Sequence, residues 1–266
     1  MAKLFLVGTP IGNLKDITYR AIETLNFVDV VACEDTRHSM ILLNAYEIKK
    51  PLISVHKFNE KMQVEKVASL LRDGKNVAYI SDAGMPGISD PGFILLTELK
   101  KQNFEVEIIP GVTAFATAMV GSGLDSSHFT FLGFLPEKQK EKKMLLERYK
   151  ALDSTLIFYV SSHNIEKDLR AFFENLGNRK VVVANELTKK FEKYICGNLE
   201  DIKIQDPKGE YVVLVEGANL QSPLNELSLE EHFDYYIKEG LKKMDAIKKV
   251  AQDRGLKKDE VYKHFV

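Results

Sequence analysis

Short apolar runs alternate with amphipathic segments along most of the 266-residue chain. Runs such as Lys3–Gly8 and Val30–Cys33 are typical of buried strands, and segments such as Asp16–Phe27 gather apolar residues on one helical face. This alternation predicts a mainly parallel sheet whose strands are joined by crossover helices. In the first half, strands are expected at 3–8, 30–33, 52–56, 76–81 and 104–109, and helices at 16–27, 40–46, 60–72 and 94–101.

A second set of elements follows a polar stretch from Gly121 to His128. Strands are expected at 129–134, 155–160, 181–184, 192–196 and 210–215, with 192–196 at an edge, and helices at 141–152 and 165–176. The polar stretch is the predicted domain boundary. The sequence therefore predicts an α/β protein with one α/β domain at 1–121 and another at 122–218.

From residue 219 the pattern changes to a linker, Gln221–Glu226, followed by helical periodicity. Ser228 with Glu231 fits a capping box. Apolar stripes at Tyr236–Leu241 and Ala246–Ala251 predict two helices. Gly255 is expected to end the second, and residues 257–265 can form a third. Residues 219–266 are thus predicted to be a linker and a small helical tail.

Composition and charge limit the functions open to the chain. Hydrophobic residues make up 45% and charged residues 28%, as in ordinary globular proteins. The 37 Lys and Arg against 38 Asp and Glu give a net charge of −1, so nucleic-acid binding would have to come from local basic patches. Two such patches are visible, one at 137–150 and one from residue 238 to the end, where nine basic residues face five acidic ones.

The two cysteines, Cys33 and Cys196, cannot build a disulfide scaffold or a four-cysteine zinc site, and we expect both to be buried free thiols. No convincing metal-ligand cluster is visible. The first residues lack a secretory apolar region, and no stretch approaches the ~18 apolar residues of a membrane span. We expect a cytoplasmic protein with no membrane partner and no metal.

Polar or glycine-rich segments follow several predicted strands, where open α/β sheets bind ligands. Gly8–Leu14 can turn tightly, but it is not the glycine fingerprint of dinucleotide-binding proteins. Glu34–Arg37 offers carboxylates that could accept a proton and a guanidinium that could hold phosphate. Asp35 could instead cap the helix that follows it.

Two later segments suit a small cofactor. In Ser81–Gly92, Asp90 and Pro91 are interpreted as the N-cap and first residue of a helix, which leaves Asp82 without a capping role. Backbone groups of this segment can wrap a cofactor, and Asp82 can face its positive part. In Pro110–Phe115, small residues at a helix start leave room for a ligand beside free N–H groups.

Together these segments resemble the tetrapyrrole methylase superfamily of S-adenosylmethionine-dependent methyltransferases. Within it, the chain is most similar to the branch that methylates the 2′-oxygen of a cytidine in small-subunit ribosomal RNA. The matching segments are Thr9–Leu14, Ala32–His38, His56 with Asn59 and Glu60, Ser81–Gly84, Ser89–Gly92, Pro110–Gly111, Gly133–Pro136, Leu156–Tyr159, Glu186–Lys189 and Val215–Gly217. Three residues depart from the family pattern, namely Met85, Gly87 and Asn185, where Thr, Leu and Arg are expected.

The resemblance implies two α/β domains with S-adenosyl-L-methionine in the cleft between them, in a homodimer that acts on ribosomal RNA or the small ribosomal subunit. The implied cofactor positions are Asp82, Ala83, Gly84, Met85, Thr113, Ala114, Tyr159, Leu187 and Glu216. Expected substrate contacts are Thr9, Pro10, Gly12 and Asn13. They belong to Gly8–Leu14, which is taken to follow a strand next to the one before Glu34–Arg37, so that both segments face the RNA side of the cleft.

The candidate catalytic residues are Glu34, Asp35, Arg37 and Glu60. Glu34 is the first choice as proton acceptor, with Asp35 and Glu60 as rivals. Two other functions stay open. One is methylation of a tetrapyrrole or another small molecule by the same fold, and the other is a non-catalytic RNA-binding or assembly role.

Overall fold

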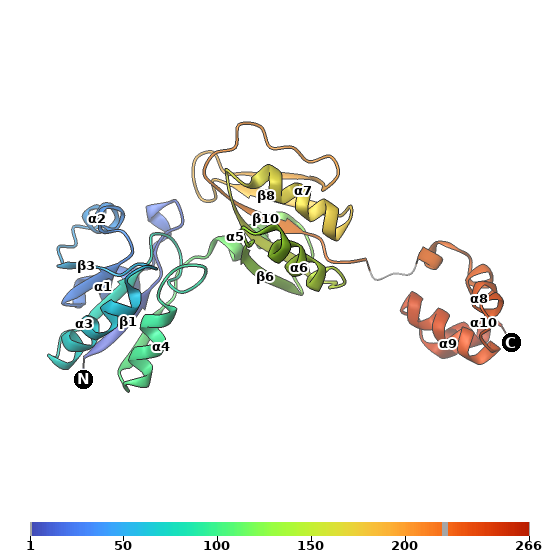
Figure 1. Ribbon diagram of the computed structural model, residues 1–266, viewed down its shortest axis with the longest axis horizontal. Coiled ribbons are helices and arrows are strands. Elements are labelled where there is room, and N and C mark those ends of the chain that lie inside the picture. The colour runs from blue at the N-terminus through green and yellow to red at the C-terminus, as the bar shows by residue number, and fades with distance from the viewer. Residues whose placement is uncertain (1, 220–222, 266) are drawn as a thin grey trace.

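The computed structural model describes residues 2–219 and 223–265. It contains two five-stranded sheets, each covered by helices, and a helical C-terminal group (Figure 1). The predicted linker residues 220–222 lie outside the described residues. No helix in the described part of the chain is long and apolar enough to cross a membrane.

The first sheet has the strand order β3-β2-β4-β1-β5, and all of its pairings are parallel. Its central strands β2 and β4 are apolar and buried at every position, as expected for a sheet covered on both faces. The predicted parallel sheet is therefore confirmed for this domain. Its elements are β1 (Lys3–Val7), η1 (Leu14–Asp16), α1 (Tyr19–Phe27), β2 (Val30–Cys33), α2 (Thr36–Ala45), β3 (Leu52–Ser54), α3 (Glu60–Arg72), β4 (Val77–Ile80), α4 (Phe93–Lys101) and β5 (Glu105–Ile109).

The strand order corrects one expectation about the site. The segments Gly8–Leu14 and Glu34–Arg37 were expected to follow neighbouring strands, but β4 lies between β1 and β2. Gly8–Leu14 is therefore grouped with the loops after β4 and β5. Glu34–Arg37 lies between the loops after β4 and β3.

The second sheet has the order β6-β7-β10-β8-β9 and is mixed. Only β6 and β7 pair in parallel, whereas β10 runs antiparallel to both β7 and β8. The predicted edge position of the strand near 192–196 is confirmed, because β9 pairs with β8 alone. The elements are β6 (Phe129–Phe134), α6 (Gln139–Tyr149), β7 (Thr155–Ser161), α7 (Ile165–Leu176), β8 (Lys180–Asn185), β9 (Lys193–Asn198) and β10 (Glu210–Val215).

Helix α5 (Ala114–Ser122) begins before the polar stretch, ends inside it and packs on the second sheet. Its buried Ala118 and Met119 share a core cluster with Ile157, Val182 and Leu214. Helices α6 and α7 cover the opposite face through Leu146 and Phe172, among other residues. Helix α5 thus belongs to the core of the second domain, and its N-terminus connects the two domains.

Two residues differ from their expected roles. Asp90 is not the N-cap of α4, which begins after Gly92, a residue with a φ of 125°. The carboxylate of Glu60 takes the capping role instead, accepting hydrogen bonds from the Gly92 and Leu95 N–H groups at 2.9 and 2.8 Å.

Cys33 is buried as expected, but Cys196 is exposed because β9 is an edge strand.

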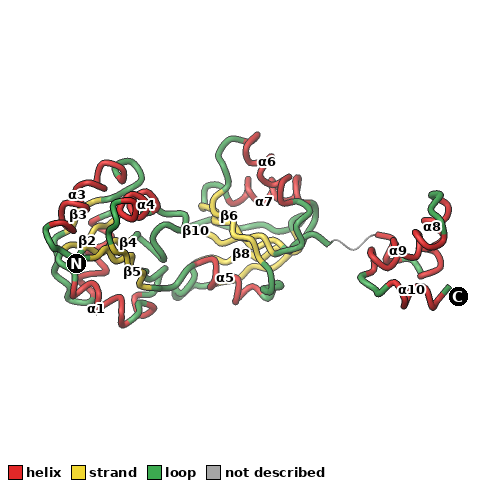
Figure 2. Tube along the Cα trace, turned by 90° about the horizontal axis from the view of Figure 1, so that it is seen from below, coloured by secondary structure: helices red, strands yellow, loops and turns green. Residues whose placement is uncertain are grey.

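The C-terminal tail contains η2 (Pro223–Glu226), α8 (Leu229–Lys238), α9 (Lys243–Arg254) and α10 (Lys258–His264). The predicted capping box of Ser228 and Glu231 is present, and Gly255 ends α9 with a φ of 63°. The buried stripe of α9, which includes Ile247 and Val250, packs with Val261 of α10 in a separate cluster. Figures 1 and 2 both show this group apart from the two sheets.

Candidate active site

The loops after β1, β4 and β5 meet at the carboxyl edge of the first sheet. A Cβ on Gly8 would lie 2.7 Å from the Gly111 Cα and 2.7 Å from the Met85 Sδ, so the loop after β1 touches the other two. Thr9 and Gly84 form an antiparallel bridge, with N···O distances of 2.9 and 3.2 Å. These three segments therefore form one connected surface.

The carboxyl ends of β6 and β8 in the second sheet face this surface. A Cβ on Gly12 would lie 2.8 Å from the Leu187 carbonyl oxygen, and one on Gly133 would lie 3.0 Å from the Ser89 Oγ. The turn after β8 is strained, because Glu186 and Thr188 adopt φ values of 53° and 65°. The Thr188 Oγ1 is also buried without a hydrogen-bond partner. Loops of both domains thus meet at one site, and the turn that the second domain contributes is strained.

Aromatic side chains join the start of α5 to the second sheet at this site. The Phe115 N–H donates to the Tyr159 hydroxyl at 3.2 Å, and the Phe115 ring stacks on Phe131 with centroids 4.6 Å apart. Phe131 in turn contacts Tyr159 edge-on. Burial, followed by the charges of nearby carboxylates, raises the pKa of Tyr159 to about 12. The side chain of Thr113 makes no capping bond, so the first N–H groups of α5 have no helical acceptor, and among them that of Phe115 bonds to Tyr159.

Carboxylates gather beside these loops. Burial first, and then the charge of Asp82, raises the pKa of Glu34, although nearby His56 opposes the shift. Burial also raises the pKa of Asp90 to about 7, with further contributions from Glu34, Glu210 and Asp82 in that order. Since Glu210 begins β10, both domains contribute charge to the site. Sequence reasoning missed Asp90 because an Asp-Pro pair before a helix is typical of a cap.

The remaining catalytic candidates are occupied by structural contacts. Asp35 caps α2, accepting from the Arg37 N–H at 2.8 Å, and also pairs with the Arg37 guanidinium at 2.7 Å. The Arg37 hydrogen bonds hold the pKa of Asp35 at about 2, which makes it a poor proton acceptor. Glu60 is buried and caps α4. Among the candidate catalytic carboxylates, Glu34 is therefore the one whose raised pKa and freedom from capping contacts best suit a base.

The structure does not bring all the expected binding residues together. Thr9 and Pro10 are buried, and the Thr9 hydroxyl donates to carbonyl groups of Ser81 and Gly84. Asn13 caps η1 through the Lys15 N–H. Of the expected substrate contacts, only Gly12 is exposed.

Glu216 lies at the far end of the second sheet. Because β10 runs antiparallel, Glu210 pairs with Ser161 at the site while Val215 pairs with Leu156 at the opposite end. Glu216 follows Val215 and makes an ion pair with Lys180. Glu216 therefore lies away from the strand-end loops that form the candidate site.

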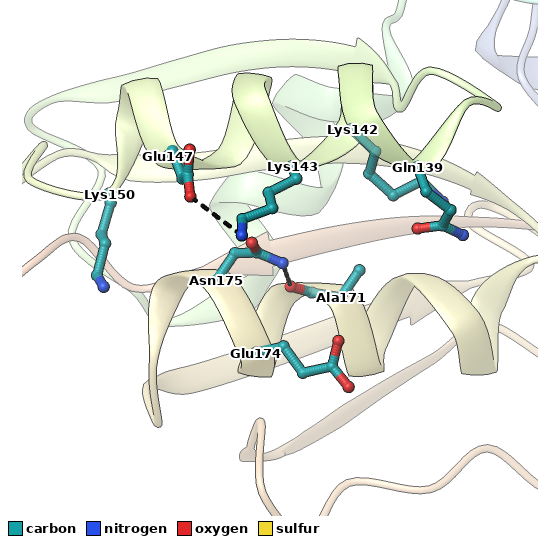
Figure 3. Close-up of a pocket in the computed structure, with 8 residues that line it drawn as sticks. All are labelled: Gln139, Lys142, Lys143, Glu147, Lys150, Ala171, Glu174 and Asn175. Atoms are coloured by element: carbon teal, nitrogen blue, oxygen red, sulfur yellow. Dashed lines mark hydrogen bonds and ion pairs between the residues drawn. The ribbon is translucent and has the colours of Figure 1, made fainter.

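A groove of about 360 Å³ lies elsewhere, between α6 and α7 (Figure 3). The Lys143 ammonium reaches Glu147 across a turn of α6, and Lys142 makes a buried ion pair with Asp168 at 2.5 Å. Most charged groups that line the groove thus already have partners, and the groove is separate from the strand-end loops.

Comparison with known proteins decides the family. The family model of the tetrapyrrole (corrin/porphyrin) methylases matches residues 3–203. The chain belongs to the tetrapyrrole methylase family. The methylase is 42% identical to ribosomal RNA small subunit methyltransferase I of Bacillus subtilis, over 98% of this chain and 93% of that one. It is 49% identical to the same-named protein of Mycoplasmopsis pulmonis, over 80% of this chain and 97% of that one.

A solved structure confirms the fold of the methylase. The uroporphyrin-III C-methyltransferase of Thermus thermophilus, complexed with S-adenosylhomocysteine, superposes with a TM-score of 0.58 at 18% identity. The match covers 80% of this chain and 97% of that one. The predicted fold class is thus confirmed, and so is the prediction of an S-adenosylmethionine-dependent methyltransferase.

Several groups at the strand-end loops of the methylase fit such a donor. The Asp82 carboxylate can face a cation, the N-terminus of α5 offers N–H donors, and the exposed Ala83 leaves the loop open to a ligand. Gly87 has a φ of 82°, and a leucine would be strained in this backbone conformation. These residues could hold the cofactor, with Leu187 and Tyr159 on the side of the second domain.

Replacing Asp82 by Ala should weaken S-adenosylmethionine binding about tenfold or more, because a charged partner contributes roughly 1.5–3 kcal/mol. Asp82→Asn is the matched control, since it keeps an acceptor for the Asp35 N–H, 3.2 Å away in the native protein, while removing the charge. Calorimetry measures both affinities. Unchanged affinity in a folded Asp82→Ala protein would remove Asp82 from the site.

Asp90 should make stability depend on pH. Its folded pKa of about 7 lies above the ordinary value of 3.8, so its favourable contribution is lost as the pH rises from about 4 to about 7. Asp90→Asn should therefore raise the free energy of unfolding more at pH 8 than at pH 5. The difference between the two effects should be roughly 1–2 kcal/mol after allowance for partial exposure. Thermal unfolding at both pH values checks this, with the exposed Asp201→Asn as control. The same difference in both variants would contradict it.

Proposed function

We propose that this methylase transfers a methyl group from S-adenosylmethionine to the 2′-hydroxyl of a cytidine in small-subunit ribosomal RNA. The observation that carries the proposal is its 42% identity, over nearly the whole chain, to a protein named ribosomal RNA small subunit methyltransferase I. The solved neighbour that acts on uroporphyrin supports the fold alone, because its identity is only 18%. Ribosomal RNA is therefore favoured over a tetrapyrrole as the substrate.

The site can perform this reaction mainly by positioning. When bound, S-adenosylmethionine supplies a methyl group on a positively charged sulfur. Loop Ser81–Gly87 and the start of α5 would hold the donor, and the adjoining Glu34–Arg37 segment would receive the ribose. Alignment of the two reactants can contribute roughly 7–11 kcal/mol.

A carboxylate beside the strand-end loops would accept the proton of the 2′-hydroxyl. General-base catalysis contributes about 10²–10⁴-fold and works best when the base has a pKa near the working pH. Burial and the charge of Asp82 move Glu34 in that direction, whereas Asp35 is held at a pKa of about 2 by Arg37. We assign the proton acceptor to Glu34, with Asp90 as a second carboxyl group whose pKa of about 7 lies near the working pH.

The partner proposed for this chain is the small ribosomal subunit or its RNA, and the site of action is the cytoplasm. A homodimer is proposed from the family resemblance. The exposed guanidinium of Arg37, held in place by Asp35, is suited to a phosphate of the RNA.

The function is tested by transfer of labelled methyl groups to three substrates, namely undermodified small subunits, fully modified subunits and a corrin precursor. Label should enter only the undermodified subunits and be recovered as a 2′-O-methylcytidine nucleoside. Transfer to the corrin precursor would establish the alternative small-molecule function. RNA binding without cofactor binding or transfer would establish a non-catalytic role.

Glu34→Gln should slow single-turnover methylation by about 10²–10⁴-fold, because the amide cannot take up the proton. Cofactor affinity should change little. Asp35→Asn is the comparison variant. It should slow methylation less, because it only weakens the contact that holds the Arg37 guanidinium in place. Near-normal single-turnover methylation by Glu34→Gln would exclude Glu34 as the base.

Removing the tail after Ala218 should weaken binding to the small subunit and leave cofactor binding nearly unchanged. The helices from Leu229 to His264 form their own core, and basic side chains outnumber acidic ones from residue 238 onward. Phosphate contacts from this group would supply affinity rather than the methyl-transfer step. The salt dependence of binding should also flatten. Full affinity with an unchanged salt slope would instead assign the tail to packing or a dimer contact.

A further inference from the structure

An exposed aromatic side chain follows β3, the strand beside the one that leads into the candidate base. Phe58, in the turn between β3 and α3, is 90% exposed, and Met62 one turn later in α3 is 74% exposed. Neither side chain contributes to the core of the first domain. The folded chain therefore leaves a large apolar surface in water at this place.

The backbone that carries Phe58 is held by a local network. The Asn59 side chain accepts from the His56 N–H at 2.8 Å and donates to the Ser54 carbonyl at 3.1 Å. The Phe58 N–H donates to the His56 Nδ1 at 3.3 Å, and the two rings lie edge-on with centroids 6.1 Å apart. The ring is thus presented by an ordered turn.

Strand order places this turn on the substrate side of the site. β3 is the edge strand, and its neighbour β2 leads into Glu34. The Ser54 hydroxyl donates to the Glu34 carbonyl at 3.4 Å, which links the two strand ends directly. The charge of His56 also acts on Glu34, so the start of this turn lies near the candidate base. Phe58 follows His56 by two residues and contacts its ring, on the β3 side of the sheet and away from the loops after β1 and β5.

Charge around Phe58 indicates the kind of partner. Lys57 and Lys61 flank it, both are exposed, and neither enters an ion pair among the described residues. The exposed Arg37 lies after the adjacent strand. An exposed ring between unpaired cations fits single-stranded nucleic acid, in which bases stack on aromatic rings and phosphates meet basic side chains.

We propose that Phe58 is a stacking platform for an unpaired base next to the methylated nucleotide, with Lys57 and Lys61 on the adjoining phosphates. The inference rests on the proposed function and adds a substrate-positioning surface to it. It explains how a ribose could be held at Glu34, since stacking of a neighbouring base would limit movement of the strand.

The test uses the full-length protein with Phe58→Ala, Phe58→Trp and Phe27→Ala. Phe27 is a matched control because it is 64% exposed but ends α1, which packs on β1, with β2 and β4 between that strand and β3. Affinity for undermodified small subunits is measured by filter binding, and KM and kcat by methyl transfer. Stacking of one base contributes about 1–3 kcal/mol, so Phe58→Ala should weaken subunit binding and raise KM about tenfold or more. Its kcat and cofactor affinity should stay near normal, and Phe58→Trp should restore binding.

Lys57→Ala and Lys61→Ala should each reduce the salt slope of binding by about one. Unchanged subunit affinity in Phe58→Ala, or an equal loss in Phe27→Ala, would overturn the platform. Failure of the native protein to methylate the subunit would count against the proposed function. Because filter binding does not depend on methyl transfer, it would still decide the role of Phe58.

Discussion

The close contact between the loops after β1, β4 and β5 is the constraint on which the site depends. Gly8 and Gly111 leave no room for a Cβ between them, and the Thr9–Gly84 bridge ties the third loop to the first. A side chain at either glycine would push apart the segments that carry Asp82 and Thr113. The same loops contact the second domain at Leu187, so this packing also determines how the two domains meet.

Electrostatics divide the acidic groups at this edge into different roles. Asp35 and Glu34 are adjacent in sequence, yet a guanidinium lowers the pKa of one and burial beside Asp82 raises that of the other. Glu60 caps a helix, while burial raises the pKa of Asp90 to about 7, so that it exchanges protons near neutral pH. The site can therefore hold a cation and accept a proton with neighbouring carboxylates. This combination is what methyl transfer from a positively charged donor to a hydroxyl requires.

Local sequence patterns were sufficient to predict most elements and the loops that carry the site. Helices 60–72 and 165–176 and strands 30–33, 129–134 and 210–215 agree with the structure at both ends. The helices have a clear apolar face, and the strands are short apolar runs bounded by polar residues. What could not be predicted depends on contacts distant in sequence. Strand direction places Glu210 rather than Glu216 at the site, and Glu60 replaces Asp90 as the cap of a helix whose first N–H groups lie 32 and 35 residues later. Likewise, Cys196 is exposed because its strand ends the sheet.

The central claim is that loops of both domains form a single site for the methyl donor at the carboxyl edge of the first sheet. A crystal structure of the protein with S-adenosylhomocysteine tests it most directly. The account predicts ligand density against Ser81–Gly87 and the start of α5, with Leu187 and Tyr159 on the facing side. Density confined to the groove between α6 and α7, or contact with only one domain, would contradict it.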